Sequence, residues 1–357
     1  MTKLSKILFI LISLVAVGSV FAGADALTAF GVPQSVAGIL CPSGVSVAIL
    51  PLLLPITEQQ TGLVVAYKNK ALIADQAMPV KQLDGPELSF KWWKRRLGDA
   101  FTAQDTKVGR MSAPNKVYFE GDWESAVAKA FGLETSVMNE DLDQIKDKTR
   151  YLNSALEGLI DRVLLGREVR VAGIVQDAAN YESSQVKTCT AEERIGTNTD
   201  VYGMIMQMFE DALVRPNVFG MNSLVYTKLR SDKSIIAAIY PNGNGKGVAT
   251  KEQLMELFEV DDLIVGKARV NTNRNPKSPS LENCWGNNLW AHYQEPLSSL
   301  TDGLAWGMTA QVGDRVAETV EDKDMGLKGG VTIKSGFYQA EVVTAKAAGV
   351  LIKGIAA

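Results

Sequence analysis

The segment from Asn139 to Asp177 constrains the fold more than any other part of the chain, because it predicts one long helix. Asn139 is a suitable N-terminal cap, and acidic residues follow in the first turn, where the helix dipole favours them. Such a helix, about 30 residues long, spans roughly 45 Å. That length is too great for a compact small domain and suits the backbone of an elongated one. Apolar residues recur along it at three- and four-residue spacing and form one stripe, at Ile145, Leu152, Leu156, Leu159, Ile160 and Val163.

Residues 80–120, before this helix, predict two extended arms around a polar loop. ELSFKWWKRR leads in and KVYFEGDW leads out, both rich in aromatic and β-branched residues, as strands are. Basic residues outnumber acidic ones from Lys81 to Lys116, and the reverse holds from Val117 to Asp147. This pattern fits an arm that rests on the acidic surface of a neighbouring copy. Two unrelated solvated faces are the alternative.

The motif KWWKRR is the strongest interaction signal in the chain. Aromatic residues interleaved with basic ones can stack on bases and grip phosphates. Tryptophan and arginine are also the residues that most often anchor protein interfaces. We favour the interface, and the predicted inter-subunit contacts are Lys91, Trp92, Trp93, Lys94, Arg95 and Arg96.

The C-terminal half of the chain has an α/β texture. We expect a helix in DVYGMIMQMFEDALVRPN that ends at Pro216, a strand and a short helix over 218–239, and a helix capped by Thr250. A strand in DDLIVGKARVNT and long alternating strands from 315 to 352 follow. PNGNGKGVAT between the helical segments lacks the phosphate-loop pattern, since Gly247 follows Lys246, and reads as a flexible loop.

Nothing in the sequence forms a catalytic constellation. The chain has one histidine, His292, in a setting that suggests a structural role, and three cysteines without CxxC spacing. The net charge of −3 gives no sign of a general nucleic-acid binder. The chain has two acidic clusters. A helix N-terminus explains the first, and a solvated turn explains the second. The first comprises Glu140, Asp141 and Asp143, and the second comprises Glu318, Glu321, Asp322 and Asp324. We therefore expect no enzyme activity, metal or cofactor.

The first 55 residues differ in character from the rest of the chain. Lys3 and Lys6 precede an apolar run and small residues, which is the pattern of a secretory signal peptide. A membrane anchor and an apolar extension that packs against protein are the alternatives, although the run is short for a spanning helix. Ordinary globular texture begins near Thr57.

In order, these parts resemble the major capsid proteins of tailed bacteriophages, which have the Hong Kong 97 (HK97-like) capsid fold. The resemblance covers about residues 56–357, and each matching motif is weak singly but fairly specific in series. The matching stretches are ALIADQAMPV (71–80), LGREVRVAGIVQDAANY (165–181), RPNVFGMNSLVYTKLRSDKSIIAAI (215–239), VATKEQLMELFEVDDLIVGKARVNT (248–272) and FYQAEVVTAKAAGVLI (337–352).

The resemblance implies an α+β chain with an N-terminal arm, an extended β loop, a long spine helix, and peripheral and axial domains. The implied divisions are an apolar extension and arm (1–67), an extended loop (81–120), a peripheral domain (68–80, 121–200 and 301–340, with the spine helix at 139–177) and an axial domain (201–300 and 341–357).

The resemblance also implies a structural protein whose copies form hexamers and pentamers in an icosahedral shell around double-stranded DNA. Its implied partners are copies of itself, DNA bound without sequence specificity, and scaffolding, portal and decoration proteins. Assembly in the host cytoplasm argues against export, which leaves the N-terminus as an inward-facing or interface-packed arm, with membrane association as the alternative. Two other functions remain open: an encapsulin-like compartment shell, and an exported or membrane-anchored α/β binding protein.

Overall fold

The computed structural model describes residues 72–83, 85–95, 102–110, 113–118, 121–197, 200–241, 247–273, 280–295 and 304–356. The signal-like N-terminal segment lies outside these residues, as do Arg96 and the centre of the glycine-rich loop at 242–246. The interpretations given to them from the sequence stay predictions.

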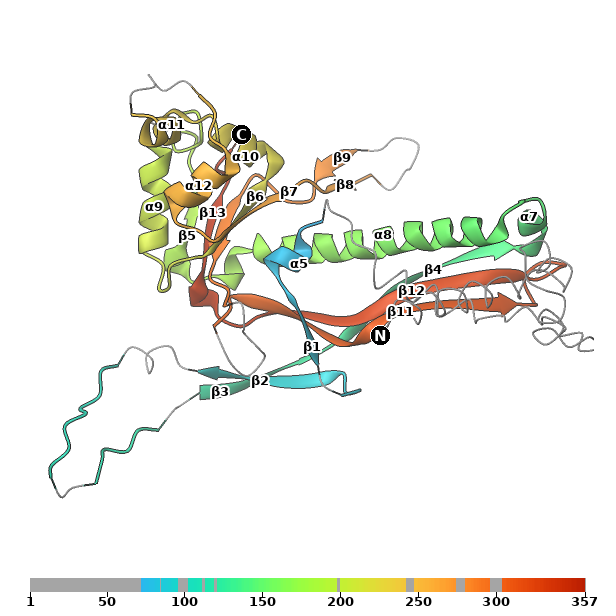
Figure 1. Ribbon diagram of the computed structural model, residues 1–357, viewed down its shortest axis with the longest axis horizontal. Coiled ribbons are helices and arrows are strands. Elements are labelled where there is room, and N and C mark those ends of the chain that lie inside the picture. The colour runs from blue at the N-terminus through green and yellow to red at the C-terminus, as the bar shows by residue number, and fades with distance from the viewer. Residues whose placement is uncertain are drawn as a thin grey trace, which may run out of the picture. The chain divides into compact units, whose positions relative to one another are not determined.

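The described residues form a mixed α and β fold (Figure 1). The helices are α5 (Ala74–Ala77), α7 (Asn139–Asp143), α8 (Lys148–Val175), α9 (Val201–Glu210), α10 (Ser223–Leu229), α11 (Lys233–Ile239) and α12 (Lys251–Phe258). The strands are β1 (Val80–Leu83), β2 (Ser89–Arg95), β3 (Gly121–Val127), β4 (Lys129–Met138), β5 (Val186–Thr188), β6 (Val218–Asn222), β7 (Asp262–Gly266), β8 (Arg269–Asn271), β9 (Leu281–Asn283), β10 (Leu289–His292), β11 (Gly307–Asp322), β12 (Gly330–Val343) and β13 (Gly349–Lys353).

The predicted long helix is two helices. Helix α7 ends at Asp143, and α8 begins at Lys148, where the Asp147 side chain accepts a hydrogen bond from the Arg150 amide at 3.0 Å and caps a new helix. Asn139 is not the cap that the sequence suggested. The side-chain amide of Asn139 instead donates a hydrogen bond to the Lys328 carbonyl, and this bond connects α7 to the turn between β11 and β12.

Helix α8 runs along a four-stranded sheet with the order β1-β11-β12-β4 (Figure 1). The predicted apolar stripe is confirmed from Leu152 to Val163, and it packs against Ile333 and Phe337 of β12. Ile145 lies between the two helices and is half-buried. In the sheet, β11 and β12 pair over most of their length, as the alternating pattern predicted, with a register shift between Val312 and Val316.

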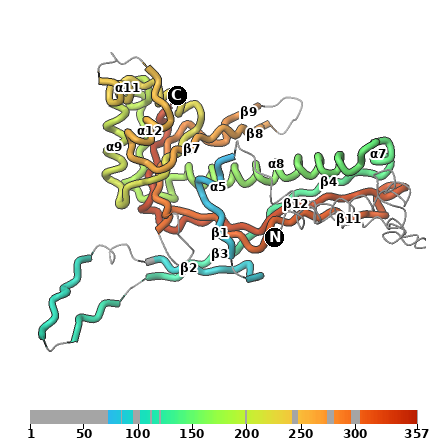
Figure 2. The backbone as a smooth tube through the Cα atoms, viewed as in Figure 1, coloured from blue at the N-terminus to red at the C-terminus, as the bar shows by residue number. Residues whose placement is uncertain are grey.

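A second sheet has the order β5-β13-β10-β6-β7, and helices α9 to α12 gather beside it (Figure 2). Every residue of β6 is buried, and a core cluster joins one face of the sheet to the helices through side chains such as Phe209, Phe219 and Phe258. The predicted cap of α12 is confirmed. Thr250 and Gln253 form a reciprocal capping box, which satisfies two backbone donors at the start of that helix.

The other face of this sheet carries a row of five buried aromatic rings. Trp285, Trp290, His292, Trp306 and Tyr181 follow one another with ring centroids 5.0–5.5 Å apart. The rings lie close to the strand backbones because glycines stand beneath three of them. These glycines are Gly266 under Trp285, Gly220 under Trp290 and Gly349 under Trp306.

His292 has the structural position that its sequence setting suggested, because it is 1% exposed and stacks between Trp290 and Trp306. Burial lowers the pKa of His292 from 6.5 to about 4. The folded state therefore binds this proton less well than the unfolded state. The contribution of His292 to the free energy of unfolding is therefore fully present above pH 6.5. It is lost as the pH falls toward 4, and the loss is about 3 kcal/mol.

We expect His292→Phe, which keeps a ring in the row, to remove this part of the pH dependence. Urea unfolding of the wild type and the variant at pH 7 and pH 4.5 measures it, because all other titrating groups are common to both. The wild type should lose more stability than the variant on acidification. Equal losses would show that burial of His292 does not control acid sensitivity.

Candidate inter-subunit surface

Strands β2 and β3 form an antiparallel hairpin with two different faces. Trp93 lies opposite Trp123 in the register, and alternate residues point to opposite sides. On one face, Phe90 and Trp92 pack against Ala310 of the four-stranded sheet, and Trp92 is only 6% exposed. This face holds the hairpin on its own chain.

The other face of the hairpin carries an aromatic pair, in which Trp123 is exposed and Trp93 is half-buried. The Trp93 and Trp123 rings meet edge to face with centroids 5.1 Å apart, and Trp123 is 63% exposed. Lys91 is exposed two residues before Trp93 and therefore on the same face. A large exposed aromatic on a regular strand is typical of a surface that another molecule covers.

The structure thus divides the residues predicted from KWWKRR. Lys91 and Trp93 lie on the open face, whereas Trp92 is buried by its own chain. Lys94 bonds Glu124 of the same hairpin at 2.8 Å, so part of the predicted charge complementarity is satisfied within one chain. Arg95 ends β2, and Arg96 lies outside the described residues. The strand predicted in KVYFEGDW begins only at Gly121.

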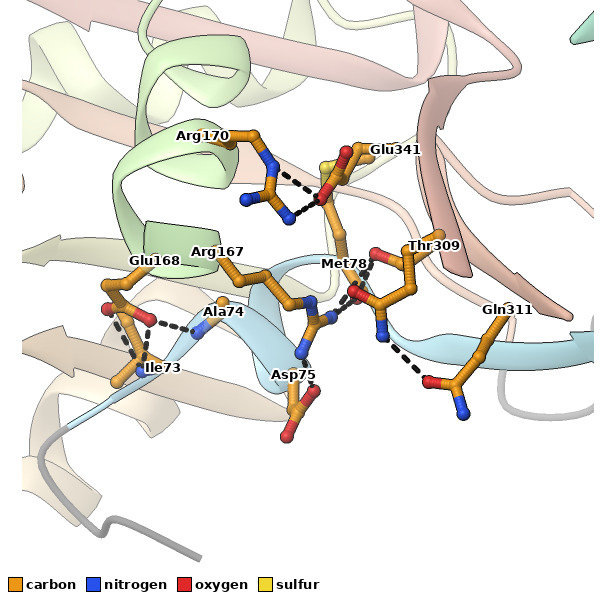
Figure 3. Close-up of polar contacts among 11 residues, drawn as sticks. Ile73, Ala74, Asp75, Met78, Arg167, Glu168, Arg170, Thr309, Gln311 and Glu341 are labelled. Atoms are coloured by element: carbon orange, nitrogen blue, oxygen red, sulfur yellow. Dashed lines mark hydrogen bonds and ion pairs between the residues drawn. The ribbon is translucent and has the colours of Figure 1, made fainter. Parts of the chain in front are cut away.

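A buried carboxylate fixes the segment that leads into the sheet and the hairpin. Glu168 of α8 accepts hydrogen bonds from the backbone amides of Ile73 and Ala74, at 3.1 and 2.8 Å (Figure 3). It also accepts one from the indole nitrogen of Trp285 at 2.6 Å. Burial raises the pKa of Glu168, and these donors and Arg167 oppose that rise. The Glu168 side chain therefore connects three parts of the molecule: the backbone at Ile73 and Ala74, helix α8 and the row of aromatic rings.

The next residue on the helix, Arg167, completes the junction and is 1% exposed. Its guanidinium pairs with Asp75 and donates to the Met78 carbonyl and the Thr309 hydroxyl, each at 3.2 Å (Figure 3). These contacts hold α5 and the start of β1 against α8 and β11. Burial of a charge at this site is tolerated because paired groups surround it.

One turn further, Arg170 fixes the helix to β12. It lies 3.5 Å from the centre of the Phe131 ring, and its Nη2 donates to Glu341 at 2.9 Å. Arg170 therefore joins the helix to two strands of the sheet at once.

Our sequence analysis assigned no role to Arg167, Glu168 or Arg170. A signal for the first two was present, because positions 167 and 168 continue the spacing of Ile160, Val163 and Leu164 on the buried face. A charged pair in the apolar phase of a helix indicates buried and partnered charges.

The first acidic cluster lies at a helix start, as expected, but most of the second lies on a strand and not in the turn that the sequence suggested. Glu140 and Asp141 occupy the first turn of α7, and Glu318, Glu321 and Asp322 belong to the outer part of β11. Among the described residues, no group of histidine, cysteine or carboxylate side chains has the arrangement of a metal site. In the same residues, no helix combines the length and apolar character needed to cross a membrane.

The long helix on a long β sheet, the hairpin of β2 and β3 and the second helix-covered sheet define the HK97-like capsid fold. Two solved structures support this fold. A phage-related protein from Bordetella bronchiseptica RB50 superposes with a TM-score of 0.61 at 20% identity, over 84% of this chain and 96% of that one. The capsid of cyanophage P-SCSP1u superposes with a TM-score of 0.52 at 12% identity, over 80% and 89%.

The sequence comparisons establish the family. The major capsid protein of Pseudomonas phage JBD67 is 30% identical over 292 residues, which cover 82% of this chain and 94% of the relative. That of Burkholderia phage BcepMu is 23% identical over 65% of this chain and 74% of the relative. No family model matches. This chain belongs to the major capsid proteins of bacteriophages, and it is a structural component of a virion capsid.

Proposed function

We propose that copies of this chain assemble as hexamers and pentamers into an icosahedral shell that encloses double-stranded DNA. The observation that carries the proposal is the β2–β3 hairpin, which is anchored to its own sheet by one face and presents Trp93 and Trp123 on the other. Trp123, which its own chain leaves mostly exposed, gains burial when a neighbouring copy covers it.

The shell assembles in the host cytoplasm, with DNA held without sequence specificity and with scaffolding, portal and decoration proteins as further partners. The chain has no enzymatic role in this proposal. We place α8 and the β11–β12 hairpin in the peripheral domain and the sheet beside α9 to α12 in the axial domain. Strand β5 of that sheet lies within residues 121–200, which the resemblance assigned to the peripheral domain, so we move it to the axial domain. An encapsulin-like compartment is the alternative, but no observation on this chain favours it over the phage shell.

Particles purified from virus-producing cells test the proposal. After nuclease treatment, we expect nuclease-protected double-stranded DNA and sedimentation far faster than that of a 38.6 kDa chain. Mass spectrometry of the same particles should find portal protein. Particles that contain an enzyme and no DNA would instead establish the encapsulin-like compartment.

A further inference from the structure

In this chain, glycines within strands lie beneath large side chains. If Gly121 carried a Cβ, that atom would lie 2.6 Å from the Trp93 ring, and a Cβ at most other strand glycines would likewise meet a side chain. The missing side chain makes room for a tryptophan or methionine of the same chain at each of these positions. The pairs are Gly121 with Trp93, Gly220 with Trp290, Gly266 with Trp285, Gly349 with Trp306, Gly307 with Met78 and Gly330 with Met325.

Gly132 and Gly336 depart from this pattern. They lie directly opposite each other in β4 and β12, and Val316 of β11 is the next residue in the same row. A Cβ added to either glycine would meet backbone atoms. A Cβ on Gly132 would lie 3.1 Å from the Ser335 carbonyl oxygen, and a Cβ on Gly336 would lie 2.6 Å from the Phe131 carbonyl oxygen. The atoms nearest to either added Cβ are therefore backbone atoms and not side-chain atoms, unlike those at the six glycines above. A strand glycine often marks a close approach by another group.

The glycine pair forms the floor of an open groove of about 350 Å³. Val316 and Tyr338 border the groove and are 45% and 39% exposed, so its walls are apolar and accessible. Glu134, Glu318 and Lys334 lie toward one end, which gives that end a net negative charge. We call this site the glycine groove.

The chain also carries a tryptophan with the properties to fill such a groove. All six tryptophans are described, and Trp123 is the one with a mostly exposed ring. Lys91 lies on the same face of the hairpin and complements the negative end of the groove. The chain already combines a glycine seat with a carboxylate, since Trp285 covers Gly266 and donates its indole N–H to Glu168.

We propose that Trp123 of one copy inserts into the glycine groove of a second copy. The contact is between copies because the opposite face of the hairpin packs on its own sheet, so Trp123 points away from that sheet. A patch that fits a pocket elsewhere on the same molecule produces a head-to-tail contact, which closes into rings when the geometry allows. The proposal rests on the proposed function, because it requires copies of the chain to meet.

Disulfide capture between two single-cysteine chains tests the contact directly. One full-length chain carries Trp123→Cys and the other carries Val316→Cys, both with Cys41, Cys189 and Cys284 replaced by alanine. When the chains assemble together under mild oxidation, we expect a disulfide-linked dimer that neither chain forms alone. The matched control is Val320→Cys, which is also exposed on β11 but lies about 13 Å further along the strand. It should give at least about tenfold less dimer.

Assembly of Trp123→Ala gives a second readout. The concentration needed for particle formation should rise about 30-fold, which is the loss expected for an interface hot spot of about 2 kcal/mol. Tyr118→Ala removes another exposed aromatic, 79% exposed, which lies in the loop before β3, and this variant should assemble like the wild type.

Three results would overturn the contact. Particles that form without a disulfide between Trp123→Cys and Val316→Cys would exclude the contact but not the assembly of a shell. A Trp123→Ala chain that assembles like Tyr118→Ala would have the same meaning. Capture of the native Cys41 by Val316→Cys, in a sample that keeps Cys41, would show that the N-terminal segment fills the groove instead. If the wild type forms no particles either alone or with a scaffolding protein, the proposed function itself fails.

Discussion

Replacing Glu168 by alanine should lower the free energy of unfolding by about 3–5 kcal/mol. The substitution removes the acceptor of three donors, the amides of Ile73 and Ala74 and the indole nitrogen of Trp285, all in a buried junction. Each stranded donor costs about 1–3 kcal/mol, and breaking a buried charged network costs about 3–5 kcal/mol. Thermal and urea unfolding of the unassembled chain measure the loss, and the melting temperature should fall by about 10 °C.

Glu157→Ala is the matched control for this prediction, because Glu157 lies on the same helix and is exposed. It should change the stability by no more than about 0.5 kcal/mol. If the two variants are equally stable, the carboxylate of Glu168 does not hold the junction together.

Gly220→Ala should destabilise the chain by about 3 kcal/mol through steric overlap. An added Cβ would overlap the Trp290 ring, which is 1% exposed, stacks on His292 and packs at a tilt against Trp285. Neither side can move easily, since β6 is hydrogen-bonded to β10 and β7 and every one of its residues is buried. Overpacking of this kind costs about 1–3 kcal/mol and more where the surroundings are rigid.

Two further variants test the cause of that loss. Gly173→Ala changes a helical glycine of α8 with open space around it and should stabilise the chain by about 0.5–1 kcal/mol. Trp290→Leu is destabilising by itself, but combined with Gly220→Ala it should cost less than the sum of the two single variants. Additive losses would mean that the ring is not what excludes a side chain at position 220.

The sequence predicted the elements whose signals are local. The apolar stripe of α8, the Thr250 cap and the long alternating strands β11 and β12 all depend on spacing within one segment, and the structure confirms them. The break between α7 and α8 was missed because Asp147 competes with helix continuation through its own side chain, while the apolar spacing runs on past it.

The faces of the hairpin could not be predicted from the motif. KWWKRR places tryptophans at adjacent positions, so strand alternation puts one on each side without saying which side is buried. Only the packing of Phe90 and Trp92 on Ala310, a residue more than two hundred positions away, decides that Trp93 is on the open face. The glycine groove depends in the same way on a register between distant strands.

Electron microscopy of particles formed by this chain alone tests the central claim most directly. The chain is expressed without other viral proteins, and the lysate is imaged in negative stain. We expect closed shells, tubes or isolated six-fold rings, because the open face of the hairpin is buried only when copies meet. A chain that stays monomeric at high concentration, both alone and with a scaffolding protein, would contradict the account.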